Sequence, residues 1–122
     1  MSSIDRPLRG EALLFDLAQE RATTASGEQV ERSGRNARTL IKDGELRVTL
    51  IVVGAGGEIP EHQADGPITV HVLEGAIEFR TPNGPHPLAA GQLLSLPGGV
   101  RHSVRSAGGG TFLLTVCRPD PR

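Results

Sequence analysis

The chain has 122 residues, a length typical of one domain. Its 13 basic and 14 acidic residues leave a formal net charge of −1, which argues against partners held by charge alone, such as nucleic acid or an anionic membrane. Three phenylalanines and no tryptophan or tyrosine disfavour the aromatic stacking platforms of single-stranded nucleic acid and sugar sites.

The single cysteine, Cys117, rules out an intramolecular disulfide, and we expect it to be a buried small residue of the last strand.

The first thirty residues contain no apolar segment of the secretory type, and no apolar run is long enough to cross a bilayer. We therefore expect a cytoplasmic protein.

Residues 1–35 are predicted to form an N-terminal arm and loop. Within them, residues 12–22 are compatible with a short helix, for which Asp16 is a suitable N-cap. Residues 23–35 are polar and show no periodicity, so we expect a loop there.

Residues 36–118 are predicted to form one β-barrel domain, followed by a tail at 119–122. Apolar and β-branched runs recur every 8–12 residues or so and are separated by glycine and proline, a pattern typical of β-sandwiches and barrels. The strands expected from these runs are 37–42, 46–53, 68–73, 76–80, 92–96, 102–105 and 111–117.

The segment from Gly91 to His102 has the form G-x5-P-x-G-x2-H. A strand is followed there by a Pro-Gly-Gly turn, whose glycines tolerate backbone conformations that other residues resist, and the turn leads to a histidine on the next strand. This segment resembles the second motif of the cupin superfamily, whose usual ending, H-x3-N, is altered here because Ser106 stands at the last position.

The preceding segment is similar to the first cupin motif, G-x5-H-x-H-x3-E-x6-G. Gly56, His62 and Gly75 fall in register, whereas Ala64 replaces the second histidine and Ile68 the glutamate. The resemblance covers residues 37–117 and implies an all-β double-stranded β-helix, the jelly-roll barrel of compact RmlC-like cupins.

Cupins that bind a metal usually do so with three histidines and a glutamate, which hold iron, manganese, nickel, zinc or copper at the barrel mouth. By this resemblance only His62 and His102 remain as ligands, whereas such metals need three or four donors. Asp65, in a short turn, and His71 are the candidates for a third ligand. Strand alternation predicts, however, that His71 faces away from the barrel if Ile68 faces into it.

Three functions remain open. The first is a binding module for a small, mostly apolar or carboxylated molecule. The second is a metal-dependent dioxygenase or isomerase acting on a small organic acid or phenolic, with His62 and His102 holding the metal. The third is a dimerisation or sensor module. The sequence identifies no catalytic residue, although either histidine is suited to be the general base of a metal-free isomerase. The residues expected to line the ligand pocket are His62, Ile68, Val70, Leu94 and His102.

Three cations, Arg35, Arg38 and Lys42, precede or begin the barrel. They are able to bind an anionic ligand such as a carboxylate, but we favour a solvated edge or ion pairs with a partner chain. The nearly continuous apolar run 46–53 indicates a homodimer, in which His71 is expected on the surface or the dimer face.

Overall fold

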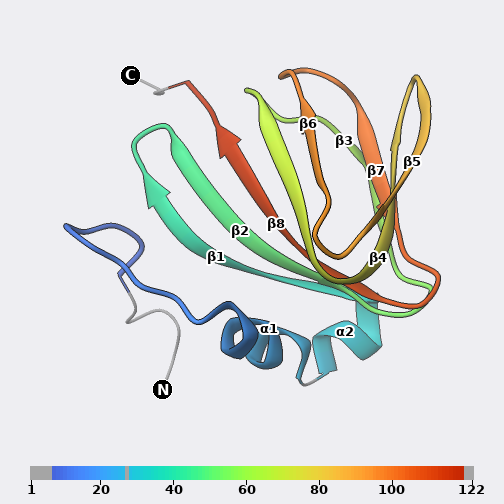
Figure 1. The fold of residues 1–122 in the computed structure, drawn as a ribbon, viewed down its shortest axis with the longest axis horizontal. Coiled ribbons are helices and arrows are strands. Elements are labelled where there is room, and N and C mark those ends of the chain that lie inside the picture. Colours follow the sequence, from blue (N-terminus) through green and yellow to red (C-terminus); the bar gives the residue numbers. More distant parts are fainter. Residues whose placement is uncertain (1–6, 27, 120–122) are drawn as a thin grey trace.

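The computed structural model describes residues 7–26 and 28–119, and two short helices precede eight strands in this part of the chain (Figure 1). Most of the predicted tail at 119–122 and the start of the predicted arm lie outside it. The elements are α1 (Leu17–Ala25), α2 (Glu28–Ser33), β1 (Arg35–Asp43), β2 (Leu46–Val53), β3 (Glu58–His62), β4 (Ile68–Thr81), β5 (Gly84–Ala89), β6 (Leu93–Leu96), β7 (His102–Arg105) and β8 (Gly110–Cys117).

Strand pairing is antiparallel throughout and follows the order β1-β2-β8-β4-β7-β3, while β5 and β6 also pair with β4. The 14-residue β4 belongs to both layers: its first half pairs with β6 and β8, and its second half with β5 and β7. The sheet therefore curls into the half-barrel visible in Figure 1. This arrangement confirms the predicted all-β jelly roll.

The barrel interior is filled by alternate residues of the inner faces. On β4, Ile68, Val70 and Val72 are buried, whereas His71 between them is only partly buried. This is the alternation that the sequence predicts. The main core cluster comprises Val53, Ile68, Val70, Val72, Ile77, Phe79, Leu88, Val104 and Phe112.

A second cluster lies on the outer face of β1 and β2, where the helices cover the sheet (Figure 1). Leu40, Leu50 and Val52 are buried there beneath apolar residues of the arm and helices, among them Leu17 and Val30. Removing such side chains from water supplies most of the stability of helices this short.

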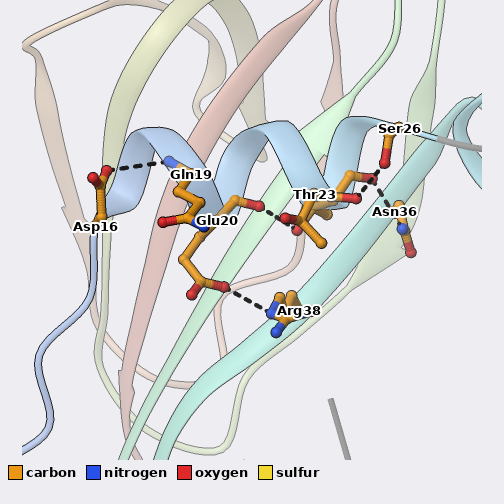
Figure 2. A network of polar contacts seen from close by, with 8 residues as sticks. Asp16, Gln19, Glu20, Thr23, Ser26, Asn36 and Arg38 are labelled. Carbon is orange, nitrogen blue, oxygen red and sulfur yellow. Dashed lines mark hydrogen bonds and ion pairs between the residues drawn. The ribbon is translucent and has the colours of Figure 1, made fainter. Parts of the chain in front are cut away.

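Polar contacts hold α1 in place (Figure 2). Asp16 caps the helix, as predicted, because its carboxylate accepts a hydrogen bond from the Gln19 backbone N–H at 3.2 Å. Glu20 lies 2.7 Å from the Arg38 guanidinium on β1. The Asn36 amide donates a hydrogen bond to the Thr24 carbonyl at 3.0 Å. The helix consequently covers 17–25 rather than the predicted 12–22, since it begins at its cap.

Several local predictions were wrong. Residues 28–33 form α2 instead of a loop, with a Glu28–Arg32 ion pair across one turn. Strands β3 and β5 are absent from the expected strands. Each contains proline, and both are edge strands, where a missing N–H is tolerated. Cys117 is exposed rather than buried. It lies one position after Val116, which packs on the core, so alternation turns Cys117 outward.

Candidate functional site

The two motif histidines meet at the end of the β3–β7 pair. His62 and His102 are register partners, and their Nε2 atoms lie 3.1 Å apart. The ring centroids are 4.3 Å apart with an interplanar angle of 67°. The structure therefore brings together residues that are 40 positions apart in sequence.

The turn of the second motif explains how His102 arrives there. Gly99 has a φ of 80°, a left-handed conformation that favours glycine, and its N–H donates to the Ala64 carbonyl at 2.9 Å. A Cβ on Gly98 would meet the Gly66 backbone at 2.8 Å. The backbone of the loop before His102 is thus in close contact with the backbone of the loop after His62.

Each ring is oriented by a carbonyl two residues earlier in the chain. The Nδ1–H of His62 donates to the Pro60 carbonyl at 2.9 Å, and the Nδ1–H of His102 donates to the Val100 carbonyl at 3.0 Å. Because a carbonyl only accepts, these bonds place a proton on both Nδ1 atoms. The Nε2 contact is then a hydrogen bond only when one ring carries a second proton.

The surroundings of His102 disfavour a second proton on its ring. His102 is 3% exposed and stacks on Phe79 with 5.0 Å between centroids and 21° between planes. Burial lowers the pKa of His102; the Val100 carbonyl opposes this effect, and the neighbouring His62 adds to it. His102 is therefore the ring of the pair in which burial favours the neutral form.

The pair faces a small apolar recess of about 40 Å³, a volume of the order of one water molecule. Besides the two rings, its lining is entirely apolar and consists of Ile51, Ile59, Phe79, Val104, Phe112 and Leu114. Against these apolar walls a hydrogen bond to the buried His102 ring is stronger than in water.

A larger cavity of about 350 Å³ adjoins the recess and shares Ile51 and Ile59 with it. Its other lining residues are Gln29, Arg35, Asn36 and Ala37. A further cavity of about 560 Å³ lies beyond Arg35 among the glycines of residues 54–57, and no histidine lines it. The space for an organic molecule beside the histidine pair is therefore the 350 Å³ cavity.

The other predicted pocket residues lie elsewhere in the barrel. Ile68 and Val70 are buried in the core, Leu94 packs against them, and none of the three lines the recess. Alternation along a strand predicts that such residues face inward, but it does not predict how deep in the barrel they lie. The same alternation along β2 places Ile51 inward, but only the curl of the sheet brings it to the histidines.

Neither candidate third ligand joins the pair. The Asp65 carboxylate lies 3.7 Å from the Arg118 guanidinium. His71 pairs in register with Leu93 and Leu113 and alternates with the inward residues of β4. Within residues 7–26 and 28–119, no group of three or more histidine, cysteine or acidic side chains is placed to hold a metal ion.

The residues present therefore do not fit a metal held by three or four protein donors. Two imidazoles converge, but the rest of their surroundings is hydrocarbon.

The family model for the cupin domain matches residues 49–117, more than half of the chain. The chain belongs to the cupin family. The half-barrel and both motif histidines fall within or beside the matched region, so the resemblance inferred from the sequence is confirmed. None of the curated proteins matches this cupin.

Solved structures with this fold include a Streptococcus pyogenes protein of unknown function, at 26% identity and a TM-score of 0.72, with 93% of this chain and 94% of that chain covered. An RmlC-like cupin from Shewanella frigidimarina has 24% identity and a TM-score of 0.64, over 69% and 76% of the two chains. A cupin superfamily protein from Desulfitobacterium hafniense has 15% identity and a TM-score of 0.66, over 69% and 77%. In the described residues of this cupin, no helix is long and apolar enough to span a membrane.

Proposed function

We propose that this cupin binds a small organic molecule in the barrel mouth and holds its polar group at the His62–His102 pair. The observation that carries the proposal is the pair itself, in which both Nδ1 atoms are engaged by backbone carbonyls, the Nε2 atoms point at each other, and the two residues line an apolar recess. Ligand sites of this kind combine apolar walls with a few convergent polar groups.

The pair offers hydrogen-bond acceptors to a ligand. Because both Nδ1 atoms carry a proton, Nε2 of each neutral ring accepts, so a ligand hydroxyl that enters the recess and replaces the Nε2–Nε2 contact has a partner. The 40 Å³ recess admits only such a group, and the ligand's body would occupy the adjoining 350 Å³ cavity.

The second candidate is a metal-dependent dioxygenase or isomerase acting on a small organic acid or phenolic. One observation favours it. Each ring donates its Nδ1–H to a backbone carbonyl, and the other ring nitrogens converge. Proteins orient the histidine ligands of metals in this way. Iron, manganese, nickel, zinc or copper would need further ligands, which the described side chains do not supply beside the two histidines. We therefore treat the metal site as degenerate, meaning that it has lost part of its ligand set.

Two measurements on tag-free protein distinguish the ligand-binding protein from the metal-dependent enzyme. Metal content by elemental analysis is compared for the wild type, His62→Ala, His102→Ala and the control His86→Ala, whose ring contacts Thr81 instead. Thermal shifts are then recorded with small carboxylates and phenols. We expect no stoichiometric metal, and shifts that disappear with His62→Ala but not with His86→Ala. Stoichiometric metal lost from both site variants would favour the enzyme.

We also propose that the cupin is a homodimer, formed through the outer face of β4, β6 and β8. His71, Leu93 and Leu113 form one row across these strands, and Leu93 is 64% exposed. Leu113 is partly buried against the second cluster, so Leu93 is the exposed apolar residue of this row that a two-fold interface would cover.

A further inference from the structure

The cavity beside the histidines is bounded on one side by Arg35. This residue begins β1 and pairs in register with Val53, a core residue, so its side chain is on the inner face of the sheet. Its Nη1 donates to the Glu58 carbonyl of β3 at 2.8 Å. Arg35 thus bridges the two strands at the ends of the sheet path, β1 and β3, at the wall of the 350 Å³ cavity.

The guanidinium of Arg35 retains unused donors. One of its five N–H groups serves the Glu58 carbonyl, and among the described residues it forms no ion pair. Most other described arginines lie within 4.0 Å of a carboxylate, namely Arg21, Arg32, Arg38, Arg80, Arg101, Arg105 and Arg118. Arg35 is therefore a cation that faces a cavity without a charge partner in the described part of the chain.

The surroundings favour an anion further. No aspartate or glutamate lines either the recess or the 350 Å³ cavity, whereas Glu31 and Glu58 line the 560 Å³ cavity, which Arg35 also borders. Arg47 pairs in register with Val116 and so shares the inner face of β2 with Ile51. Its Nε is buried without a hydrogen-bond partner. Arg47 lines neither cavity, so Arg35 is the cation that the lining of the 350 Å³ cavity presents to a ligand.

We infer that the natural ligand is a small organic acid whose carboxylate binds Arg35, whose apolar body lies against Ile51 and Ile59, and whose other end reaches the His62–His102 pair. This inference rests on the proposed function and narrows it to one ligand class. The planar fork of a guanidinium matches a carboxylate and makes a charge-assisted bond with it. The cavity volume of about 350 Å³ lies at the lower end of the usual range for ligand sites, so the acid is small.

Two isosteric probes, 6-hydroxyhexanoate and 6-hydroxyhexanamide, test this inference by NMR titration of the wild-type protein. Their hydroxyl is the polar group offered to the histidine pair. We expect both to shift the amide signals of Ile51 and Ile59. The carboxylate should bind at least about tenfold more tightly, the order of a hydrogen bond between charged groups. The Arg35→Gln variant should remove that preference, and Arg35→Lys should retain part of it. The matched control is Arg80→Gln, since Arg80 pairs with Glu78 and lines neither cavity.

The outcomes separate the inference from the proposed function. Equal affinity for acid and amide, with shifts at Ile51 and Ile59, would overturn the role of Arg35 and leave a binding cavity. No shift at these residues or at the histidines with either probe would overturn both proposals. The comparison of acid with amide uses the wild type, so it stands even if Arg35→Gln proves unstable through loss of the contact to Glu58.

Discussion

The Nε2 atoms of His62 and His102 face each other at 3.1 Å, and a backbone carbonyl holds the opposite side of each ring. The two contacts to carbonyls leave no freedom in the placement of the Nδ1 protons. Both rings are consequently held in place, with their Nε2 atoms directed at each other, before any ligand arrives. Such preorganisation reduces the entropy lost when a ligand binds.

We first predict the tautomers of the two rings. At neutral pH, long-range ¹H–¹⁵N correlation spectra of the imidazoles should show protonated Nδ1 in both His62 and His102, because each Nδ1–H donates to a carbonyl. His86, whose Nε2 contacts the Thr81 hydroxyl, serves as an internal comparison. A neutral His102 protonated on Nε2 alone would contradict the arrangement of the pair.

The second prediction concerns the pH dependence of stability. Burial lowers the pKa of His102 in the folded protein, so the unfolded chain binds more protons at this residue. Its contribution to the free energy of unfolding is therefore complete above the ordinary histidine pKa of 6.5 and declines as the pH falls through 6.5 towards the lowered pKa. Urea unfolding at several pH values between about 5 and 8 measures this slope.

A matched pair of variants assigns the slope. His102→Gln should weaken the pH dependence in this window, whereas His86→Gln should leave it as in the wild type. An identical slope in the wild type and His102→Gln would mean that other groups are responsible.

Our third prediction concerns Phe79, which is 1% exposed and lies under the His102 ring. Phe79→Ala should lower the free energy of unfolding by about 3–5 kcal/mol, because it removes buried surface and leaves a cavity. Phe79→Leu should cost less, about 1.5 kcal/mol or below, while removing the ring stack. Urea unfolding checks both values. A Phe79→Ala loss under about 1 kcal/mol would show that the barrel collapses around the site.

The fourth prediction concerns the proposed homodimer. Leu93→Glu should convert it to a monomer, because the charge would be buried in an interface without a partner. Light scattering after size-exclusion chromatography reports the mass. Leu14→Glu is the control, since Leu14 is 98% exposed and lies in the N-terminal arm. A wild-type mass equal to the monomer, or a dimer unaffected by Leu93→Glu, would reject this interface.

Much of the fold follows from local sequence. Apolar and β-branched runs define β2 within the bounds predicted, and alternation along β4 separates His71 from the core. Asp16 caps a helix because its side chain bonds to a nearby N–H, a contact that needs no distant residue. The motif spacing also identified the two histidines that meet. These features depend on interactions within a few residues or on a family pattern.

The tertiary structure alone decided the rest. The proline-containing strands β3 and β5 form because they lie at sheet edges, a position that no local preference encodes. Ile51, Ile59 and Phe79, rather than Ile68 and Val70, surround the histidines because the curl of the sheet sets the depth of each inward residue. Arg35 faces a cavity because β1 and β3 approach each other. Sequence determined which side chains point inward, and the closing of the barrel, driven by burial of apolar surface between distant strands, determined which of them meet.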